Sequence, residues 1–294
     1  MTHCVLTIAG SDSGGNAGIQ ADLRMFHAYR LHGCTVFTSL TAQNPNEVHA
    51  IHDVPADFVA AQLHSVIDVY SIRALKTGML FSAPIIQTVA DTIKDWPLIA
   101  KVIDPVMVAT SGARLLKPDA ISVIKSELLP LADLVTPNIP EAELLANAPI
   151  TDRASLRDAA KRIFDEFGCS VLVKGGHVLG DLALGEDTLY DGTEFRSFIL
   201  PPISHPVSTH GTGCSLSAAL AAELALAKSE RCRYRRKESR SRCHKELIPC
   251  RARMRSTWIH QPLITNHQQL TTKKHETHGR ENHRRNRPEL LQKT

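Results

Sequence analysis

Apolar and polar positions alternate in short blocks along the first three quarters of the chain. Short apolar or β-branched runs that end at glycine or a polar residue are typical of buried strands. Between them, blocks with apolar positions three or four residues apart predict amphipathic helices. The predicted strands span residues 4–9, 34–40, 72–76, 99–103, 132–135 and 170–173. The predicted helices span residues 19–29, 57–69, 84–93, 118–129 and 155–167.

Strands that alternate with helices in this way predict an α/β fold, in which a mostly parallel central sheet carries helices on both faces. The pair Asp191-Gly192 lies between apolar residues and predicts a hairpin over 188–195. A final helix is predicted after Gly213, where Ala and Leu become frequent. Neither a linker nor an internal repeat interrupts this pattern before about residue 229.

Polar residues follow several predicted strands at the point where each strand ends. They are Asp12, Gln43, Asp104, Asn138 and Lys174. In open α/β sheets, ligands bind beyond the carboxyl ends of the strands. We therefore predict one cleft at this edge of the sheet, lined by these side chains.

The charge composition divides the chain near residue 229. Residues 1–229 hold 16 Lys and Arg and 24 Asp and Glu, which gives a net charge of −8. Residues 230–294 hold 18 and 6, which gives +12, and their apolar positions follow no helical or strand period. We interpret residues 1–229 as a folded domain and residues 230–294 as a basic tail that is solvated or disordered.

Cysteine usage and hydropathy restrict the class of protein. The 7 cysteines are odd in number and irregularly spaced, which argues against a disulfide scaffold. The chain opens with no signal-peptide pattern, and no apolar run of about 18 residues predicts a membrane span. We expect a soluble, cytoplasmic protein without a membrane partner.

The turn Gly211-Thr-Gly213 leads directly into the final predicted helix, with Cys214 at the junction. Backbone amides at a helix start carry partial positive charge and suit a phosphate. The same dipole lowers the pKa of a thiol placed there, so we expect Cys214 to act as a base or a nucleophile. The simpler alternative is a glycine turn before a core helix with a buried cysteine, because short glycine motifs often match by chance.

Seven short motifs follow one another over residues 1–229. They are residues 6–22 with Gly10-Ser-Asp-Ser-Gly-Gly-Asn-Ala-Gly18, Thr41-Ala-Gln-Asn44, Lys76-Thr-Gly-Met-Leu80, Asp104-Pro-Val-Met107, Thr136-Pro-Asn-Ile-Pro-Glu-Ala-Glu143, Val173-Lys-Gly-Gly-His177 and Thr209-His-Gly-Thr-Gly-Cys214. Each is weak alone, but the ordered set resembles the hydroxymethylpyrimidine/phosphomethylpyrimidine kinases of thiamine biosynthesis, within the ribokinase-like superfamily. The resemblance implies a three-layer sandwich with a mostly parallel sheet between two helical layers.

The resemblance also implies an activity. Such an enzyme transfers the γ-phosphoryl group of ATP to 4-amino-5-hydroxymethyl-2-methylpyrimidine and then phosphorylates the monophosphate, with Mg²⁺ as the metal and a homodimer as the expected assembly. Cys214 would take the proton from the substrate hydroxyl. The amides of Gly211, Thr212, Gly213 and Cys214 would form the anion hole for the moving phosphate. Thr209, in the same motif, would lie beside the nucleotide phosphates.

The pyrimidine would be read by Gln43, whose amide supplies the donor and acceptor that an aminopyrimidine edge requires. The alternative is an amide that stabilises its own loop. The resemblance implies that the pocket walls are Gly10, Ala17, Met79 and Val106. For Met79 and Val106, core packing is the alternative. The resemblance implies that Asp22 lies near the pyrimidine, whereas the predicted helix alone suggests a solvated face or a charge at the helix end.

Asn138 and Glu141 match the Asn-x-x-Glu pattern of the superfamily. Through this pattern Glu141, supported by Asp104, would hold Mg²⁺ largely through water, and Asn138 would lie near the nucleotide. Without the resemblance, a helix-capping asparagine with a glutamate in the first turn is the preferred interpretation. Lys174 would meet the ATP phosphates, with an exposed strand-end lysine as the alternative. We assign no catalytic role to His177, His205 and His210.

The resemblance weakens at two places. Thr110 stands near the position where family members often carry a lysine, so one phosphate-facing charge would be missing. After Ser229 the family continues with two Ala-rich helices that this sequence does not match. A shifted reading frame or a misjoined gene model would produce such an abrupt change in composition.

Two alternative functions stay open. One is a pyridoxal or pyridoxine kinase, whose substrate is also a flat ring with a hydroxymethyl group. The other is an inactive kinase-like protein whose basic tail binds nucleic acid. The tail contains one Tyr and one Trp, and this scarcity of stacking side chains disfavours nucleic acid as a partner.

Overall fold

The computed structural model describes residues 3–44, 47–107, 116, 119–175, 180–181, 185–199 and 210–234, with side chains up to residue 227 in the last segment. All of them belong to one unit of the chain, Met1–Cys250; the second unit, Arg251–Thr294, lies outside the described residues. Among the described residues, no helix is both long enough and apolar enough to cross a membrane.

Nine strands form a single sheet in the described part of the chain, in the order β3-β2-β1-β4-β5-β6-β7-β8-β9. They are β1 (Cys4–Asp12), β2 (His32–Gln43), β3 (Val48–Asp53), β4 (Ile72–Thr77), β5 (Ala100–Ile103), β6 (Leu134–Val135), β7 (Ser170–Val173), β8 (Glu186–Tyr190) and β9 (Phe195–Ile199). Pairing is parallel from β2 through β1, β4, β5 and β6 to β7. The antiparallel pairs of the described sheet are β2 with β3, β7 with β8, and β8 with β9. The prediction of a mostly parallel sheet is confirmed.

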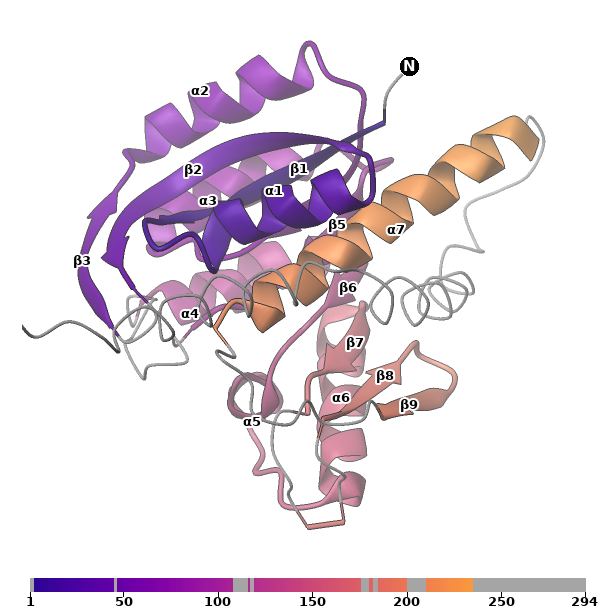
Figure 1. Cartoon of the computed structure of the whole chain (residues 1–294). Coiled ribbons are helices and arrows are strands. Elements are labelled where there is room, and N and C mark those ends of the chain that lie inside the picture. Colours follow the sequence, from indigo (N-terminus) through magenta and orange to yellow (C-terminus); the bar gives the residue numbers. More distant parts are fainter. Residues whose placement is uncertain are drawn as a thin grey trace, which may run out of the picture. The chain divides into compact units, whose positions relative to one another are not determined.

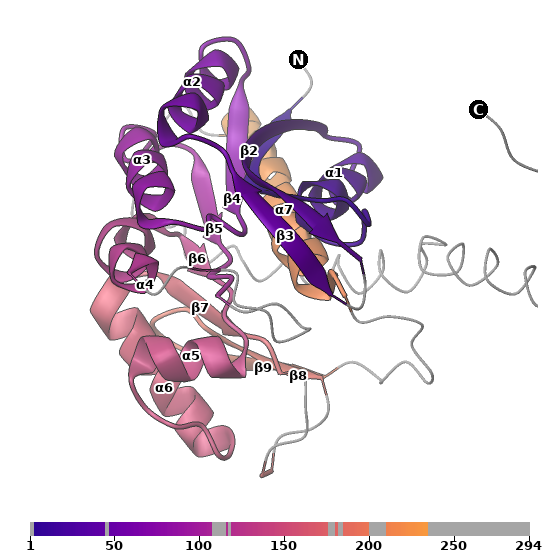
Figure 2. The same cartoon turned by 90° about the vertical axis from the view of Figure 1, so that its left-hand side faces the viewer.

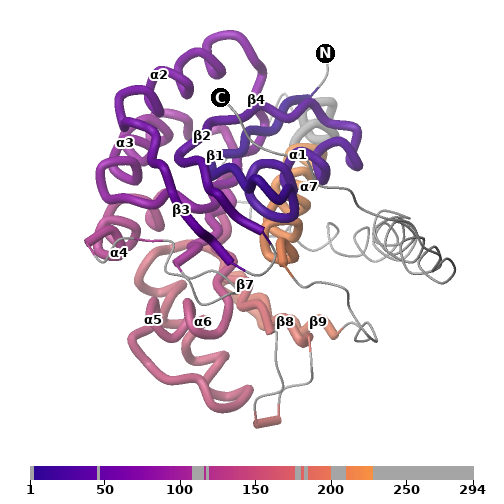
Figure 3. The backbone as a smooth tube through the Cα atoms, turned by 60° about the vertical axis from the view of Figure 1, so that its left-hand side comes forward, coloured from indigo at the N-terminus to yellow at the C-terminus, as the bar shows by residue number. Residues whose placement is uncertain are grey.

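Helices cover both faces of this sheet (Figures 1 and 2). They are α1 (Gly18–Ala28), α2 (Ala56–Ile67), α3 (Ala83–Ile93), α4 (Ala120–Val123), α5 (Ile139–Ala146), α6 (Arg153–Phe167) and α7 (Thr212–Tyr234). In Figure 2, α2 to α6 lie on one side of the sheet, and α1 and α7 on the other. Figure 3 shows α7 beside α1, although the two helices come from opposite ends of the described chain. This arrangement is the predicted three-layer sandwich.

The predicted strands and helices are present, with shifts at their ends. The helix predicted over 118–129 changes type along its length, because α4 continues as a π-helical segment, Ile124–Leu128, and a 3₁₀ turn, Leu129–Leu131. Pro130 cannot donate the backbone hydrogen bond that would continue an α-helix through this turn. The predicted hairpin forms as β8 and β9, which pair antiparallel across Asp191-Gly192.

Two elements were not predicted. Strand β3 is the edge of the sheet and is largely exposed, so its sequence carries no apolar run. Helix α5 is short, and its start at Asn138 was considered only as a capping alternative. Both are held by pairing or capping that apolar periodicity does not register.

The core lies between the sheet and the two helical layers. Fully buried apolar side chains of the central strands include Leu6, Val36, Leu75, Ile103 and Val135. This packing fixes the positions of the carboxyl ends of these strands. The polar residues that follow the strands form the site described below.

Candidate active site

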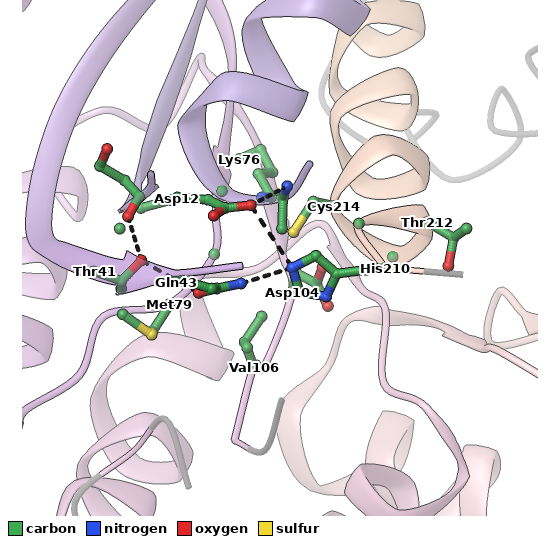
Figure 4. Close-up of a pocket in the computed structure, with 18 of the residues that line it drawn as sticks. Asp12, Thr41, Gln43, Lys76, Met79, Asp104, Val106, His210, Thr212 and Cys214 are labelled. Atoms are coloured by element: carbon green, nitrogen blue, oxygen red, sulfur yellow. Dashed lines mark hydrogen bonds and ion pairs between the residues drawn. The ribbon is translucent and has the colours of Figure 1, made fainter. Parts of the chain in front are cut away.

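A pocket lies beyond the carboxyl ends of the parallel strands, against the start of α7 (Figure 4). It is lined by Asp12, Gln43, Asp104, Asn138 and Lys174. The prediction that the polar strand ends meet in one cleft is therefore confirmed. The other sequence-predicted residues that line it are Gly10, Ala17, Met79, Val106, Glu141, Gly211, Thr212, Gly213 and Cys214. Of the predicted site residues, Asp22 does not line the pocket, and Thr209 lies outside the described residues.

The loop after β1 is organised by the Asp12 carboxylate. It accepts hydrogen bonds of 2.8 Å from the backbone amides of Gly14, Asn16 and Ala17. An aspartate that binds its own downstream amides closes a tight turn. The turn brings Ala17 back beside the strand, where it forms part of the pocket wall.

A second turn, at Gly211, packs against this loop. The φ of Gly211 is +85°, and a Cβ at this position would lie 1.9 Å from the carbonyl oxygen of Asn16. Only glycine therefore allows the two loops to come this close. Helix α7 begins at the next residue, Thr212, which lines the pocket, so the helix start faces the space where an anion would bind.

Cys214 lies in the first turn of α7 and lines the pocket. The expectation that its pKa falls is wrong, because burial raises the pKa of the thiol above its usual value. The Lys76 ammonium and a hydrogen bond from the Gly18 amide act in the opposite direction but do not outweigh burial. The free-energy cost of removing water from the thiolate is therefore larger than the stabilisation that these positive groups provide.

Lys174, which is partly buried, and Asp104, which is buried, form an ion pair beside the turn. The Lys174 Nζ lies 2.9 Å from Asp104 Oδ1, and the Ser217 hydroxyl of α7 donates to Asp104 Oδ2 at 3.0 Å. A Cβ on Gly213 would lie 3.4 Å from the Lys174 Nζ, which places this ammonium next to the start of α7. Burial raises the pKa of Asp104, but the Lys174 and Lys76 ammoniums more than reverse this and hold it below its usual value.

Asn138 and Glu141 form a reciprocal cap at the start of α5. The Glu141 amide donates to Asn138 Oδ1 at 2.8 Å, and the Asn138 amide donates to Glu141 Oε2 at 2.9 Å. The capping interpretation is thus correct, and both residues also line the pocket. Burial, with a smaller contribution from Asp104, raises the pKa of Glu141 to about 7, although Lys174 opposes this.

These carboxylates fit a hard cation that is bound mostly through water. Within the described residues, no group of three or more His, Cys, Asp or Glu side chains is suited to hold a metal directly. Asp104 and Glu141 nevertheless line one pocket, and the repulsion between them contributes to the high pKa of Glu141. Mg²⁺ prefers oxygen ligands and keeps several waters, so this pair suits it when phosphates supply the remaining ligands.

The structure buries Asp22 instead of presenting it to the pocket. Its carboxylate accepts a 2.6 Å hydrogen bond from the Thr7 hydroxyl and pairs with the Lys76 Nζ at 2.9 Å. Its side chain is 0% exposed, so the alternative of a solvated helix face is also wrong. Lys76, which was not predicted as a site residue, lines the pocket in its place. The available signal was a lysine within an otherwise apolar strand.

Gln43 is held by protein partners. Its Nε2 lies 2.6 Å from the Nε2 of His210, and its Oε1 accepts from the Thr41 hydroxyl at 3.2 Å. The His210 Nε2 also lies 3.7 Å from Asp12 Oδ2. His210, to which no role was assigned, is therefore the link between the predicted pyrimidine reader and the loop after β1 (Figure 4).

Several other sequence-based expectations lie outside the described residues. They concern Thr110, His177, His205 and the tail beyond Tyr234. Helix α7 itself continues to Tyr234, five residues past the predicted domain boundary at 229.

Comparisons with known proteins agree with this geometry. Residues 12–232 match the family model described as phosphomethylpyrimidine kinase. The hydroxymethylpyrimidine/phosphomethylpyrimidine kinase of Haemophilus influenzae is 47% identical over 224 residues, which cover 75% of this chain and 82% of that protein. The thiamine biosynthesis bifunctional protein ThiED of Geobacter sulfurreducens is 49% identical over 221 residues, and the chain covers 44% of its length.

Two solved structures resemble the fold. A phosphomethylpyrimidine kinase from Clostridium difficile is 37% identical with a TM-score of 0.67, over 76% of this chain and 91% of that one. A Bacillus subtilis pyridoxal kinase in complex with ADP is 38% identical with a TM-score of 0.70, over 77% and 85%. These structures confirm the predicted ribokinase-like fold. With the sheet, the pocket and the match over residues 12–232 in agreement, this chain belongs to the phosphomethylpyrimidine kinase family.

Proposed function

We propose that this protein transfers the γ-phosphoryl group of ATP to 4-amino-5-hydroxymethyl-2-methylpyrimidine, and then phosphorylates the monophosphate to the diphosphate used for thiamine biosynthesis. The observation that most supports this is one pocket that combines Cys214 at the start of α7, the neighbouring Lys174 and the amide of Gln43. A ring with a hydroxymethyl arm needs a part of the pocket that reads the ring, here called the ring half, and a part that binds the transferred phosphate, here called the phosphate half.

The ring half consists of small and soft side chains around an amide. A Cβ on Gly10 would lie 2.9 Å from Met79 Cε, so the missing side chain leaves room for the methionine to pack over the strand. Met79 and Val106 then offer apolar contact to the faces of a flat ring. His210 and Thr41 each engage one side of the Gln43 amide, so its second N–H and its second lone pair bind the aminopyrimidine edge.

The phosphate half acts on the transferred group. The amides of Thr212, Gly213 and Cys214 stabilise the moving phosphate, and Lys174 adds a fixed positive charge. As the hydroxymethyl oxygen bonds the γ-phosphorus and the bond to ADP breaks, the proton passes to the Cys214 thiolate. The raised pKa makes this thiolate scarce at neutral pH and strongly basic when it forms.

The donor set of Glu141 and Asp104 supports Mg²⁺ as the metal. When bound, the ion would neutralise charge on the ATP phosphates. Glu141 would orient the waters around it, and Asn138 would hold Glu141 in place through the shared cap. Asp104 would keep Lys174 and Ser217 aligned with the phosphates.

Mass spectrometry of the pyrimidine after incubation with the full chain, ATP and Mg²⁺ tests the proposal. We expect both the monophosphate and the diphosphate. Cys214→Ser is the matched control, because it keeps the volume and the helix start but replaces the thiol with a much weaker acid. A folded wild-type protein that gives no product would refute the proposed activity.

The likeness to a pyridoxal kinase supports one alternative substrate class. Parallel measurement of kcat/KM for the pyrimidine and for pyridoxal distinguishes the two. We expect the pyrimidine to be preferred, because the Haemophilus relative that the chain matches over most of its length carries the pyrimidine name. A preference for pyridoxal would reassign the substrate and leave the phosphate half unchanged.

We also propose that the kinase body ends near residue 229 and that residues 230–294 are a basic tail. The change in charge supports this boundary, since the tail carries +12 and the body −8. We further propose that the protein acts in the cytoplasm as a homodimer. Sequencing the gene around codon 229 tests the frameshift hypothesis, and an intact frame would refute it. A salt-sensitive shift of labelled DNA, lost on deletion of the tail, would favour the nucleic-acid alternative.

A further inference from the structure

Lys76 is a buried cation that the proposed reaction does not yet use. It lies near the end of the central strand β4, and its side chain is 0% exposed. A lysine in such a position carries a permanent charge only when a carboxylate compensates it. Asp22 of α1 does so, with its oxygens 2.9 and 3.1 Å from the Nζ, and Thr7 of β1 fixes that carboxylate at 2.6 Å.

The ammonium nevertheless reaches the pocket. Lys76 lines the pocket whereas its partner Asp22 does not, so the cation lies between the carboxylate and the active-site space. A Cβ on Gly78 would lie 2.9 Å from the Nζ, so the absence of a side chain at Gly78 leaves room for the ammonium. The Asp22 carboxylate overcomes the effect of burial and holds the pKa of Lys76 above its usual value.

The group on the other side of this ammonium is Cys214. Helix α7 packs against β4, and Figure 4 shows Lys76 and Cys214 at the same end of the pocket. The charged groups that act on the thiol come from three elements: Lys76 from β4, Asp22 from α1 and Asp104 from the end of β5. Lys174, after β7, also interacts with it. Lys76 has the largest effect among the groups that favour the thiolate.

We propose that Lys76 is a positioning residue for Cys214: held in place by Asp22, its ammonium stabilises the thiolate that accepts the substrate proton. This inference rests on the proposed function, in which Cys214 is the base. Asp22 then has a defined place in the site, behind Lys76 and out of contact with the pyrimidine. Asp22 keeps Lys76 charged and oriented toward Cys214, although its own negative charge partly opposes formation of the thiolate.

The test is the pH dependence of Cys214 alkylation by iodoacetamide in the full chain, followed by mass spectrometry of the Cys214 peptide. Only the thiolate reacts, so the midpoint reports its pKa without any need for kinase activity. Peptide resolution separates Cys214 from the other cysteines, and Cys214→Ser supplies the blank. The variants are Lys76→Met, Lys76→Arg and Asp22→Asn, with Asp22→Asn/Lys76→Met to keep the buried charges balanced if Lys76→Met fails to fold.

We expect the midpoint to follow the charge at position 76. Loss of the lysine charge in Lys76→Met raises the midpoint by about one pH unit or more, so that alkylation at neutral pH slows about tenfold. The double variant raises the midpoint by less, because the opposing charge of Asp22 is removed as well. Lys76→Arg keeps the charge and stays near the wild-type midpoint. Asp22→Asn leaves the buried ammonium without its carboxylate, so the lysine loses its charge and the midpoint rises. A purely structural role would move Lys76→Met and Lys76→Arg together, and that result, or no shift in Lys76→Met, would overturn the proposal.

Kinase assays separate this proposal from the proposed function. For Lys76→Met we expect kcat to fall at neutral pH and to recover partly at high pH, with the KM for the pyrimidine little changed. If wild-type protein gives no product while the alkylation midpoint still rises in Lys76→Met and stays unchanged in Lys76→Arg, the proposed function fails and the electrostatic pairing stands. If product forms and the midpoints do not move, the function stands and the role of Lys76 is refuted.

Discussion

At the scale of single residues, the side of the pocket that we propose for the pyrimidine contains the contact between Gln43 and His210. The short contact and the second partner, Thr41, fix the amide in one orientation before any substrate arrives. A reader that is already oriented loses less conformational freedom on binding than a free side chain would. We therefore expect His210 to contribute to specificity although it need not touch the phosphate.

His210→Ala should raise the KM for the pyrimidine about fivefold, which corresponds to one hydrogen bond of about 1 kcal/mol. The KM for ATP should stay near the wild-type value, because His210 contacts Gln43 and the loop after β1. Steady-state kinetics with each substrate varied in turn measures both. An equal rise in the two constants would mean that His210 shapes the whole pocket.

Glu141 provides a pH-dependent test. Its pKa rises from the usual 4.5 to about 7 on folding, so the folded state binds this proton more tightly than the unfolded state. The resulting stability is fully present below pH 4.5 and is lost as the pH rises through about 7. The free energy of unfolding of Glu141→Gln should therefore be up to about 3 kcal/mol higher than that of wild type at pH 8, and nearly equal to it at pH 4.5.

Urea denaturation at the two pH values, without nucleotide, checks this expectation. Glu47→Gln is the matched control, since Glu47 is 62% exposed. If Glu141→Gln were destabilising at pH 8, the carboxylate would contribute more to the cap of α5 than its burial costs.

The sequence located most pocket residues but not their electrostatics. Lys174, Asp104 and Glu141 follow strands, and this order alone places them at one edge of a parallel sheet. The direction of the Cys214 pKa shift was wrong because burial depends on neighbours distant in sequence. The pairing of Asp22 with Lys76 was missed for the same reason, since it joins residues 54 positions apart.

At the scale of elements, the proposed anion site depends on how closely two loops approach. The turn before α7 and the loop after β1 meet at Gly211, which has no room for a side chain. Apolar periodicity predicted α7 and the strand β1, but not that their loops touch, because that contact is made by backbone atoms. The same limit explains β3, which is held by pairing with β2 and is largely exposed.

Gly211→Ala should lower kcat about 100-fold or more, because the Cβ would push the start of α7 away from the Asn16 carbonyl and misalign the anion hole. Gly168→Ala is the matched control, since Gly168 also has a positive φ, of +71°, but a Cβ there meets nothing within 4 Å. The control should lose about 1 kcal/mol of stability and keep its kcat. Comparison of kcat and Tm for both variants decides the matter; equal losses of kcat would assign the effect to stability alone.

At the scale of the whole molecule, β1 joins the two parts of the sheet that lie on either side of it. It lies between β2 and β4, and Leu6 pairs with positions on both while being fully buried. The sequence predicted this core well, because buried parallel strands read as apolar runs. The order of the strands was not predicted in detail and follows from the pairing.

Leu6→Ala should lower the free energy of unfolding by about 2–5 kcal/mol, through lost burial and the cavity that remains. The KM for the pyrimidine should not change, since Leu6 does not line the pocket. Urea denaturation and kinetics measure the two effects. Phe58→Ala, at a side chain that is 60% exposed, is the control and should change stability by less than about 0.5 kcal/mol.

The meeting of the two loops has a consequence for synthesis on the ribosome. Residues 10–18, which help form the ring half, are among the first to emerge, whereas the turn at Gly211 and the start of α7 come near the end of the kinase body. A nascent chain that has not yet reached residue 210 therefore lacks the part of the pocket that we propose for the phosphate. With the proposed roles of these residues, we expect catalytic competence to be acquired late, when α7 is released and docks beside α1.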